Sequence, residues 1–291
     1  MSPEIRIEKI EKTDIIAPEL KAESSAIVFQ RHEKYERDPE AENAGSIMAS
    51  TIESASQRNK DFFREVIARD EPGSETMILF ISSDTQYAHN GYRGMETAQI
   101  VQDAAIEILS DLDIDPRERI LNLNSSFKTD SFEEHSIRPY KKIREPQIFE
   151  PIEYVNYLKE TYGKNEHGGL SPQAWGAHER DAAKEKREEL GIESVYDMLE
   201  RTKDSLAIME RYSQWFHSYN PGKKLIIWAV SHYDTISPLV KDATGTEFEQ
   251  YLPVDYGAGV VIVLEKDHEP TFTIQRQKIV LNLGKKAVAN E

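Results

Sequence analysis

The chain has 291 residues, of which 38% are hydrophobic and 30% are charged. This composition is typical of a globular protein with a sizeable core, and it excludes a disordered chain. The net charge of −16 repels nucleic acid and anionic membrane surfaces, so we expect neither as a partner. The sequence contains no cysteine, which excludes disulfides, thiolate nucleophiles and cysteine-based zinc sites.

The first twenty residues place single apolar residues between charged ones and lack the apolar core of a signal peptide. The longest apolar runs, LIIWAV from Leu225 and VVIVL from Val260, are far too short to cross a bilayer. We therefore expect a cytoplasmic protein.

Short apolar runs alternate along the chain with longer segments of helical periodicity. Strands are expected at 26–30, 77–81, 119–123, 225–230 and 259–264, followed by an alternating stretch from Thr271. Helices are expected at 44–68, 93–112, 152–162 and 194–219. This order predicts an α/β fold, a three-layer sandwich whose mostly parallel sheet is flanked by helices. The few residues around Glu269 and Pro270 predict a closing antiparallel hairpin at the sheet edge.

The segment from Asn124 to about Gly191 interrupts this alternation with prolines, mixed charge and the helical tract AHERDAAKEKREEL. It is too long for a plain connection and too polar for a core strand. We predict a single domain over residues 1–291 that carries an insertion or lid at about 124–191. The sequence leaves the oligomeric state open.

Ligands of open α/β sheets bind outside the carboxyl ends of the strands, so the polar residues after each apolar run are the candidates for a site. Arg31 and His32 follow the first run, and His232 follows the run from Leu225. Arg93 opens the predicted helix that follows the second run. Two histidines and two arginines from distant parts of the chain are therefore expected at one rim.

This set of side chains suits phosphoryl chemistry. Arginine donates to two phosphoryl oxygens in a fixed geometry and stays charged at any working pH. A neutral imidazole can act as nucleophile and form a phosphohistidine that water later hydrolyses. A second, protonated imidazole would stabilise charge on the phosphoryl oxygens.

Four segments resemble the motifs of the histidine phosphatase superfamily, in its phosphoglycerate mutase-like branch. In chain order they are VFQRHEKY, RGMETAQ, IESVYDMLERTKDSL and AVSHYDTI. The resemblance implies that His32 is the phosphorylated nucleophile, that Arg31 and Arg93 bind the phosphate, and that His232 completes the pocket. It also implies a reaction that needs neither a metal ion nor a cofactor.

The sequence departs from the family pattern at three places. Glu33 stands where the family usually has glycine, and nine residues separate Ser83 from Arg93 where the family has only a few. The glutamate that serves as general acid has no clear counterpart after the predicted strand at 119–123. The remaining candidates for a proton donor are Asp130, Glu133, Glu134 and Asp234.

The sequence thus predicts a phosphohydrolase that acts on a phosphomonoester, either a small molecule or a phosphoprotein, through a phosphohistidine at His32. One alternative is a phosphotransferase like phosphoglycerate mutase. Another is an impaired pseudo-phosphatase that binds a phosphorylated ligand or a protein partner, with Glu33 and the missing acid having removed turnover.

Overall fold

The computed structural model of the chain describes residues 7–37, 41–86, 91–129, 132–145, 152–166, 168–248, 250–274 and 277–283. Of residues 128–129 and 132–135 it describes the backbone alone.

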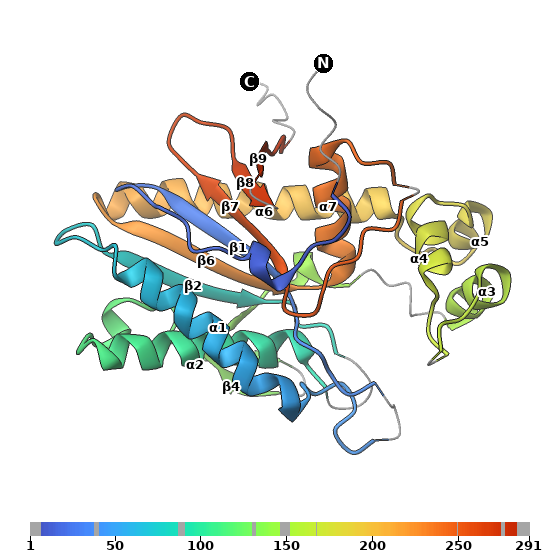
Figure 1. The fold of residues 1–291 in the computed structure, drawn as a ribbon, viewed down its shortest axis with the longest axis horizontal. Coiled ribbons are helices and arrows are strands. Elements are labelled where there is room, and N and C mark those ends of the chain that lie inside the picture. Colours follow the sequence, from blue (N-terminus) through green and yellow to red (C-terminus); the bar gives the residue numbers. More distant parts are fainter. Residues whose placement is uncertain are drawn as a thin grey trace.

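A seven-stranded sheet with the order β5-β2-β6-β1-β7-β8-β9 forms the centre of the molecule (Figure 1). Its strands are β1 (Ser25–Arg31), β2 (Thr76–Ser82), β5 (Arg138–Pro139), β6 (Lys224–Ser231), β7 (Gly259–Leu264), β8 (Thr271–Ile274) and β9 (Gln277–Val280). The four strands from β5 to β1 run parallel, and β7, β8 and β9 continue the sheet in antiparallel pairings. The predicted hairpin is present between β7 and β8, and β9 extends it.

Helices cover both faces of this sheet, which confirms the predicted three-layer α/β architecture (Figure 1). The helices α1 (Ala49–Ile67) and α2 (Arg93–Asp111) lie on one face, and α6 (Val195–Tyr219) and α7 (Tyr233–Thr244) lie on the other. Side chains alternate between the two faces along a strand. Accordingly, Ala26 and Val28 of β1 join the hydrophobic cluster of α1 and α2, whereas Ile27 and Phe29 join that of α6 and α7.

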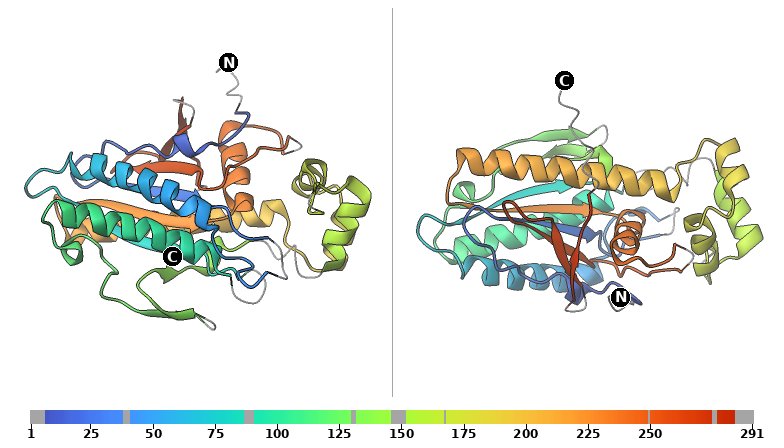
Figure 2. Two further views of the ribbon diagram at one scale, coloured as in Figure 1. Left: turned by 60° about the horizontal axis from the view of Figure 1, so that its bottom comes forward. Right: turned by 90° about the horizontal axis from the view of Figure 1, so that it is seen from above.

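The region from 124 to 191 contains small elements of its own. They are a separate two-stranded sheet of β3 (Phe127–Thr129) and β4 (Phe132–His135), the edge strand β5, a short 3-10 turn η3 (Lys141–Ile143), and the helices α3 (Ile152–Tyr162), α4 (Pro172–Glu179) and α5 (Lys184–Glu189). Helices α3 and α4 and the residues that flank α5 share a small hydrophobic cluster that includes Tyr154 and Leu158. The three helices lie beyond one end of the sheet, where α6 reaches them (Figure 2). Their role as a lid stays a prediction.

The predicted strand at 119–123 is wrong. Pro116–Glu118 form a 3-10 turn, and Ile120 makes only one isolated bridge, to Ile78 of β2. The side-chain amide of Asn122 makes a hydrogen bond that the backbone of a neighbouring strand would otherwise make: its nitrogen donates to the carbonyl of Phe80 at 2.9 Å. Parallel pairing with β2 resumes only at β5, which is two residues long.

Two helix predictions also need correction. The first helix begins at Ala49 rather than at Ala44, and residues 41–46 form turns and bends before it. The tract AHERDAAKEKREEL is broken between α4 and α5, where Asp181 takes a left-handed conformation with φ of 55°.

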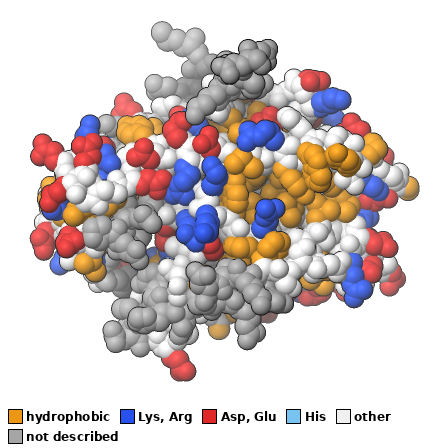
Figure 3. Space-filling model, turned by 180° about the vertical axis from the view of Figure 1, so that it is seen from behind, with side chains coloured by type: hydrophobic (Ala, Val, Ile, Leu, Met, Phe, Trp, Pro, Cys, Tyr) orange, Lys and Arg blue, Asp and Glu red, His pale blue; other side chains and the backbone are white. Residues whose placement is uncertain are grey.

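The face that carries α6 displays a group of apolar side chains interspersed with Lys and Arg (Figure 3). On α6 itself, Trp215 and Tyr219 are 55% and 71% exposed, and their rings lie 5.2 Å apart. No helix among the described residues is long and apolar enough to cross a bilayer.

Candidate active site

His32 and His232 meet at the carboxyl end of the central parallel strands. Arg31 is the register partner of Ser231 across β1 and β6, so the residues that follow each strand emerge side by side. The backbone amide of His32 donates to the carbonyl of Ser231 at 2.9 Å. Both imidazoles are buried, and their ring centres lie 5.2 Å apart.

The hydrogen bonds of His32 fix its tautomer. Nδ1 lies 2.8 Å from the backbone carbonyl of Glu33, which can only accept, so Nδ1 carries the proton and donates. The other ring nitrogen, Nε2, therefore carries a lone pair when the ring is neutral. Burial, reinforced by the charges of Arg93, His232 and Arg31, lowers the pKa of His32 well below 6.5. At neutral pH, His32 is a neutral imidazole with a free electron pair.

His232 is the residue that precedes α7 and is held between two side chains. Its Nε2 lies 2.8 Å from Oγ of Ser83, and its Nδ1 lies 3.4 Å from Oε1 of Glu145. Burial lowers the pKa of His232, although the nearby carboxylate of Glu145 opposes this effect. An anion in the site would add to that opposition and favour the imidazolium.

The two predicted arginines also belong to this group of side chains. Arg93 is the first residue of α2 and only 2% exposed, and its guanidinium carbon lies 4.4 Å from the ring centre of Tyr35. Arg31 stacks in the same way over Tyr256, at 3.9 Å, and donates to the carbonyl of Val254. Each guanidinium is thus held by a tyrosine ring, which limits its freedom. The structure brings together all four residues that the sequence singled out.

The sequence reasoning missed a fifth residue of the site, Glu145. It follows η3 and places one carboxylate oxygen, Oε1, against Arg93 and close to Nδ1 of His232. Burial alone would raise the pKa of Glu145, but the charge of Arg93 and the contacts with His232 outweigh burial and lower it. Without a ligand, Glu145 is therefore a carboxylate that neutralises the positive pocket.

Of the four acids named from the sequence, three have no described side chain, and Asp234 lies beside the site, close enough for its charge to interact with those of Glu145 and Arg93. Asp130 lies outside the described residues, and Glu133 and Glu134 belong to β4, of which only the backbone is described. Asp234, in the first turn of α7, is 7% exposed, and its Oδ2 has no hydrogen-bond partner among the described residues. Burial, together with the charge of Glu145, raises the pKa of Asp234 well above 3.8.

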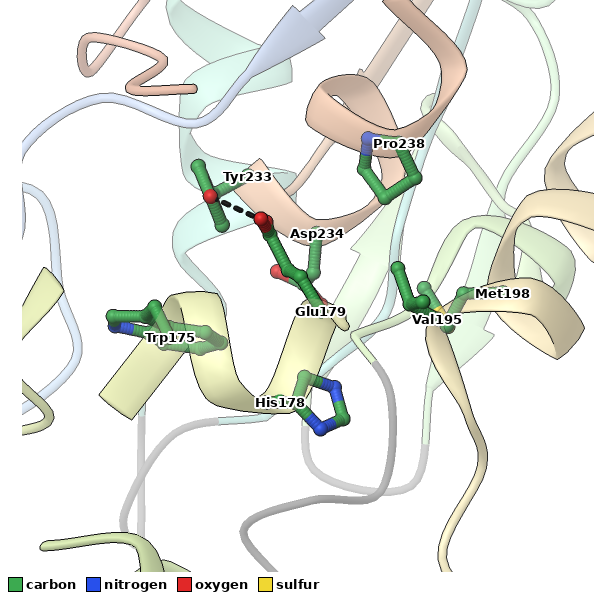
Figure 4. Close-up of a pocket in the computed structure, with 8 residues that line it drawn as sticks. All are labelled: Trp175, His178, Glu179, Val195, Met198, Tyr233, Asp234 and Pro238. Atoms are coloured by element: carbon green, nitrogen blue, oxygen red, sulfur yellow. Dashed lines mark hydrogen bonds between the residues drawn. The ribbon is translucent and has the colours of Figure 1, made fainter. Parts of the chain in front are cut away.

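Asp234 also lines a small pocket where α4 packs against α6 and α7 (Figure 4). In the wall of this pocket, Glu179 of α4 accepts a hydrogen bond from the Tyr233 hydroxyl at 2.5 Å and pairs with Lys241. The remaining lining residues are Trp175, His178, Val195, Met198 and Pro238. Helix α4 is therefore anchored to the first turns of α7, directly after His232.

Glu33 points away from the histidines. Its carboxylate pairs with Arg58 of α1 at 2.5 Å and is 1% exposed. The space it occupies exists because residue 257 is glycine, since a Cβ on Gly257 would lie 2.2 Å from Oε1 of Glu33. The extra carboxylate in this chain is thus buried under α1 and paired with Arg58.

The long connection between Ser83 and Arg93 includes residues 87–90, which lie outside the described residues. Its beginning is fixed by Asp84, which forms a two-pronged ion pair with Arg144, the residue before Glu145. The end of β2 and the segment that carries Glu145 are therefore tied together.

One set of described side chains has a spacing that could hold a metal ion. A ligand atom each of His32, Glu145 and His232 lies within 4.8 Å of the others. The positive charges of Arg31 and Arg93 beside this set oppose a cation and favour an anion. The predicted independence from metals stays a prediction.

No protein-family model matches the chain, and no curated protein matches it significantly. Solved structures with similarity include phosphoglycerate mutase from Bacillus anthracis, with 16% identity, a TM-score of 0.46, and coverage of 88% of this chain and 93% of that chain. Mycobacterial hydrolase 1 has 12% identity and a TM-score of 0.41, over 87% of this chain and 97% of its own. Mycobacterial glucosyl-3-phosphoglycerate phosphatase has 12% identity and a TM-score of 0.36, over 82% and 90%.

Proposed function

We propose that this chain is a histidine phosphatase that hydrolyses a phosphomonoester, carried by a small molecule or a phosphoprotein, through a covalent phosphohistidine at His32. One observation carries the proposal: a buried, neutral His32 with a free lone pair lies in one cluster with two arginines and a second imidazole. Such a cluster can bind a phosphoryl dianion and offer it a nucleophile.

In the first step, Arg31 and Arg93 hold the phosphoryl oxygens, and Nε2 of His32 attacks phosphorus. The bond from phosphorus to the substrate oxygen breaks, and the phosphoryl group is transferred to His32. The departing alkoxide is a poor leaving group unless it receives a proton. Glu145 is the acid whose position at the pocket suits this transfer, because it lies against Arg93 and His232.

Substrate binding itself would prepare Glu145 for this task. In the empty site the charge of Arg93 holds the pKa of Glu145 low. A bound phosphoryl dianion shares Arg93 and brings a negative charge beside the carboxylate, and both effects raise its pKa. Glu145 then takes up a proton as the substrate enters and passes it to the leaving oxygen.

In the second step, water attacks the phosphorus of the phosphohistidine, and the Glu145 carboxylate accepts a proton from this water. Inorganic phosphate and neutral His32 result. A mutase would instead deliver the same phosphoryl group to another hydroxyl of an acceptor. Two sequence features suggested a pseudo-phosphatase, the carboxylate of Glu33 and the missing acid. Neither supports that alternative any longer, because Glu33 is paired with Arg58 and Glu145 is a candidate for the acid.

The test is turnover of p-nitrophenyl phosphate by the unmodified protein and by His32→Ala. We expect release of inorganic phosphate and a loss of at least about 1,000-fold in kcat for His32→Ala. His268→Ala, at an exposed histidine outside the site, is the matched control and retains activity. Rapid quenching with a radiolabelled phosphomonoester should trap an acid-labile phosphoenzyme only when His32 is present. Phosphate binding without turnover in the unmodified protein would contradict the proposal and favour the pseudo-phosphatase.

A further inference from the structure

The segment that presents Glu145 has little regular structure of its own. It consists of β5, which is two residues long, and the single turn η3, and the backbone is extended at Arg144. A segment with so few backbone bonds does not fix the position of a side chain by itself. Its position must come from contacts with the rest of the molecule.

Side chains at the end of β6 and in the loop after β2 supply some of those contacts. Ser231, at the end of β6, donates from Oγ to the carbonyl of Ile143 at 2.8 Å. The backbone amide of Glu145 donates to Oγ1 of Thr85 at 3.2 Å. Asp84 pairs with Arg144, with Nη2 of Arg144 lying 2.6 Å from its Oδ2.

Arg201 of α6 makes the most extensive contact with this segment. Its Nη1 donates to the carbonyl of Lys142 at 2.8 Å, and its Nη2 donates to the carbonyl of Arg144 at 3.2 Å. The same guanidinium is oriented by Glu193, whose two oxygens accept from Nε at 2.8 Å and from Nη2 at 2.9 Å. Arg201 therefore joins two carbonyls that precede Glu145 to a helix of the main core.

The planar fork of arginine is suited to this arrangement. Three of its nitrogens point in fixed directions, so one side chain can bind a carboxylate on one edge and two carbonyls on the other. A lysine ammonium is a single point with three donors, and it cannot span both carbonyls and both oxygens of Glu193. Neither Arg201 nor Glu193 contacts His32, His232 or Arg93 through any described hydrogen bond or ion pair.

From these contacts we propose that Arg201, oriented by Glu193, is a positioning residue that holds Glu145 at the distance from which it can protonate the leaving group. This inference rests on the proposed function, and it assigns a role to the arginine of the IESVYDMLERTKDSL segment. The proposal distinguishes the residues that bind the phosphoryl group from those needed to protonate the leaving group. Phosphoryl binding depends on Arg31, Arg93 and the histidines, whereas leaving-group protonation also depends on Arg201.

The test compares two substrates that differ in their need for an acid. p-Nitrophenolate leaves without protonation, whereas the alkoxide of glycerol 2-phosphate does not. In Arg201→Met we expect kcat for glycerol 2-phosphate to fall about 100-fold and kcat for p-nitrophenyl phosphate to stay within about 3-fold. KM should change little for either substrate, and Arg201→Lys should recover part of the lost rate.

Lys203→Met is the matched control, because Lys203 lies on the same helix and pairs with Asp242 at 2.8 Å without contacting the Glu145 segment. It should leave the ratio of the two rates unchanged. An equal loss with both substrates in Arg201→Met, or the same selective loss in Lys203→Met, would overturn the proposal. No loss with glycerol 2-phosphate would overturn it as well.

A second measurement does not depend on turnover. The contact with Glu145 raises the pKa of His232, so withdrawal of the carboxylate should lower it. The pKa of His232, measured by NMR titration of its ring, should therefore be lower in Arg201→Met and in Glu145→Gln than in the unmodified protein. It should be unchanged in Lys203→Met. If the unmodified protein turns over neither substrate, the proposed function fails, while this titration still decides whether Arg201 positions Glu145. An unshifted His232 in Arg201→Met would refute the positioning role.

Discussion

Oε1 of Glu145 pairs with Arg93 and at the same time lies 3.4 Å from Nδ1 of His232. A single carboxylate oxygen therefore contacts one proposed phosphate ligand and one of the two histidines. This relationship makes Glu145 our candidate for the proton donor of the proposed reaction, and the first prediction concerns it directly.

Glu145→Gln keeps the shape of the side chain but removes the transferable proton. We expect kcat for glycerol 2-phosphate to fall about 100- to 1,000-fold, and kcat for p-nitrophenyl phosphate to fall by less than about 10-fold. Steady-state kinetics with both substrates measures the ratio. Glu153→Gln, at an exposed position of α3, serves as the control. Equal losses with the two substrates would contradict the assignment of Glu145.

The activity should persist at mildly acidic pH. His32 reacts as the neutral imidazole, and burial together with Arg93, His232 and Arg31 keeps its pKa well below 6.5. The acid limb of kcat/KM, corrected for ionisation of p-nitrophenyl phosphate, should therefore lie below pH 6.5. An apparent pKa above 6.5 for this limb would mean that the buried cationic environment does not act on His32.

Stability should decrease as the pH falls, in part because of His178. This buried histidine accepts or donates a bond with the Tyr154 hydroxyl at 3.2 Å, and burial lowers its pKa to about 4. Between pH 6.5 and 4 the unfolded chain binds a proton at this position and the folded chain does not. The free energy of unfolding therefore decreases as the pH is lowered through this range. The contribution is about 3 kcal/mol over this window. Chemical denaturation at several pH values should show a shallower decline for His178→Gln than for the unmodified protein. Parallel curves would rule out the contribution of His178.

Glu33 should matter little for substrate binding. Glu33→Gln removes the charge that pairs with Arg58 but leaves the anion site unchanged, so KM for p-nitrophenyl phosphate should stay within about 2-fold. The free energy of unfolding should change by less than about 1 kcal/mol, because burial raises the pKa of Glu33 and so offsets the ion pair with the partly exposed Arg58. Gly257→Ala should destabilise the protein, since the new Cβ would collide with the Glu33 carboxylate. A tenfold decrease in KM for Glu33→Gln would instead place this carboxylate beside the phosphate.

Removal of metals should leave the activity unchanged. The scheme assigns charge neutralisation to Arg31 and Arg93, so dialysis against EDTA should not lower kcat. Activity that disappears with EDTA and returns with a metal ion would contradict the metal-independent reaction.

The sequence predicted the parts of the site that long buried strands position. Arg31, His32 and His232 follow apolar runs whose length and composition identify them as central strands, and Arg93 opens a helix of clear periodicity. Glu145 has no such signal, because β5 before it comprises only Arg138 and Pro139.

The stretch at 119–123 is more apolar than β5, and for this reason we predicted a strand there instead. There the side chain of Asn122 forms hydrogen bonds with Phe80 that a neighbouring strand would otherwise form. Short edge strands depend on pairing with partners far away in the chain, and local composition does not encode that pairing. The direction of Glu33 was equally hidden, since it depends on Arg58 and on the absence of a side chain at Gly257.

The Glu145 carboxylate is a built-in counter-ion for Arg93, and any anion that enters must compete with it. The competition weakens the binding of inorganic phosphate as well as that of substrate. A site with two unopposed arginines would retain its product, whereas in the proposed reaction the Glu145 carboxylate would pair with Arg93 again and weaken the binding of phosphate. The residue proposed to assist bond cleavage would thus also limit product inhibition.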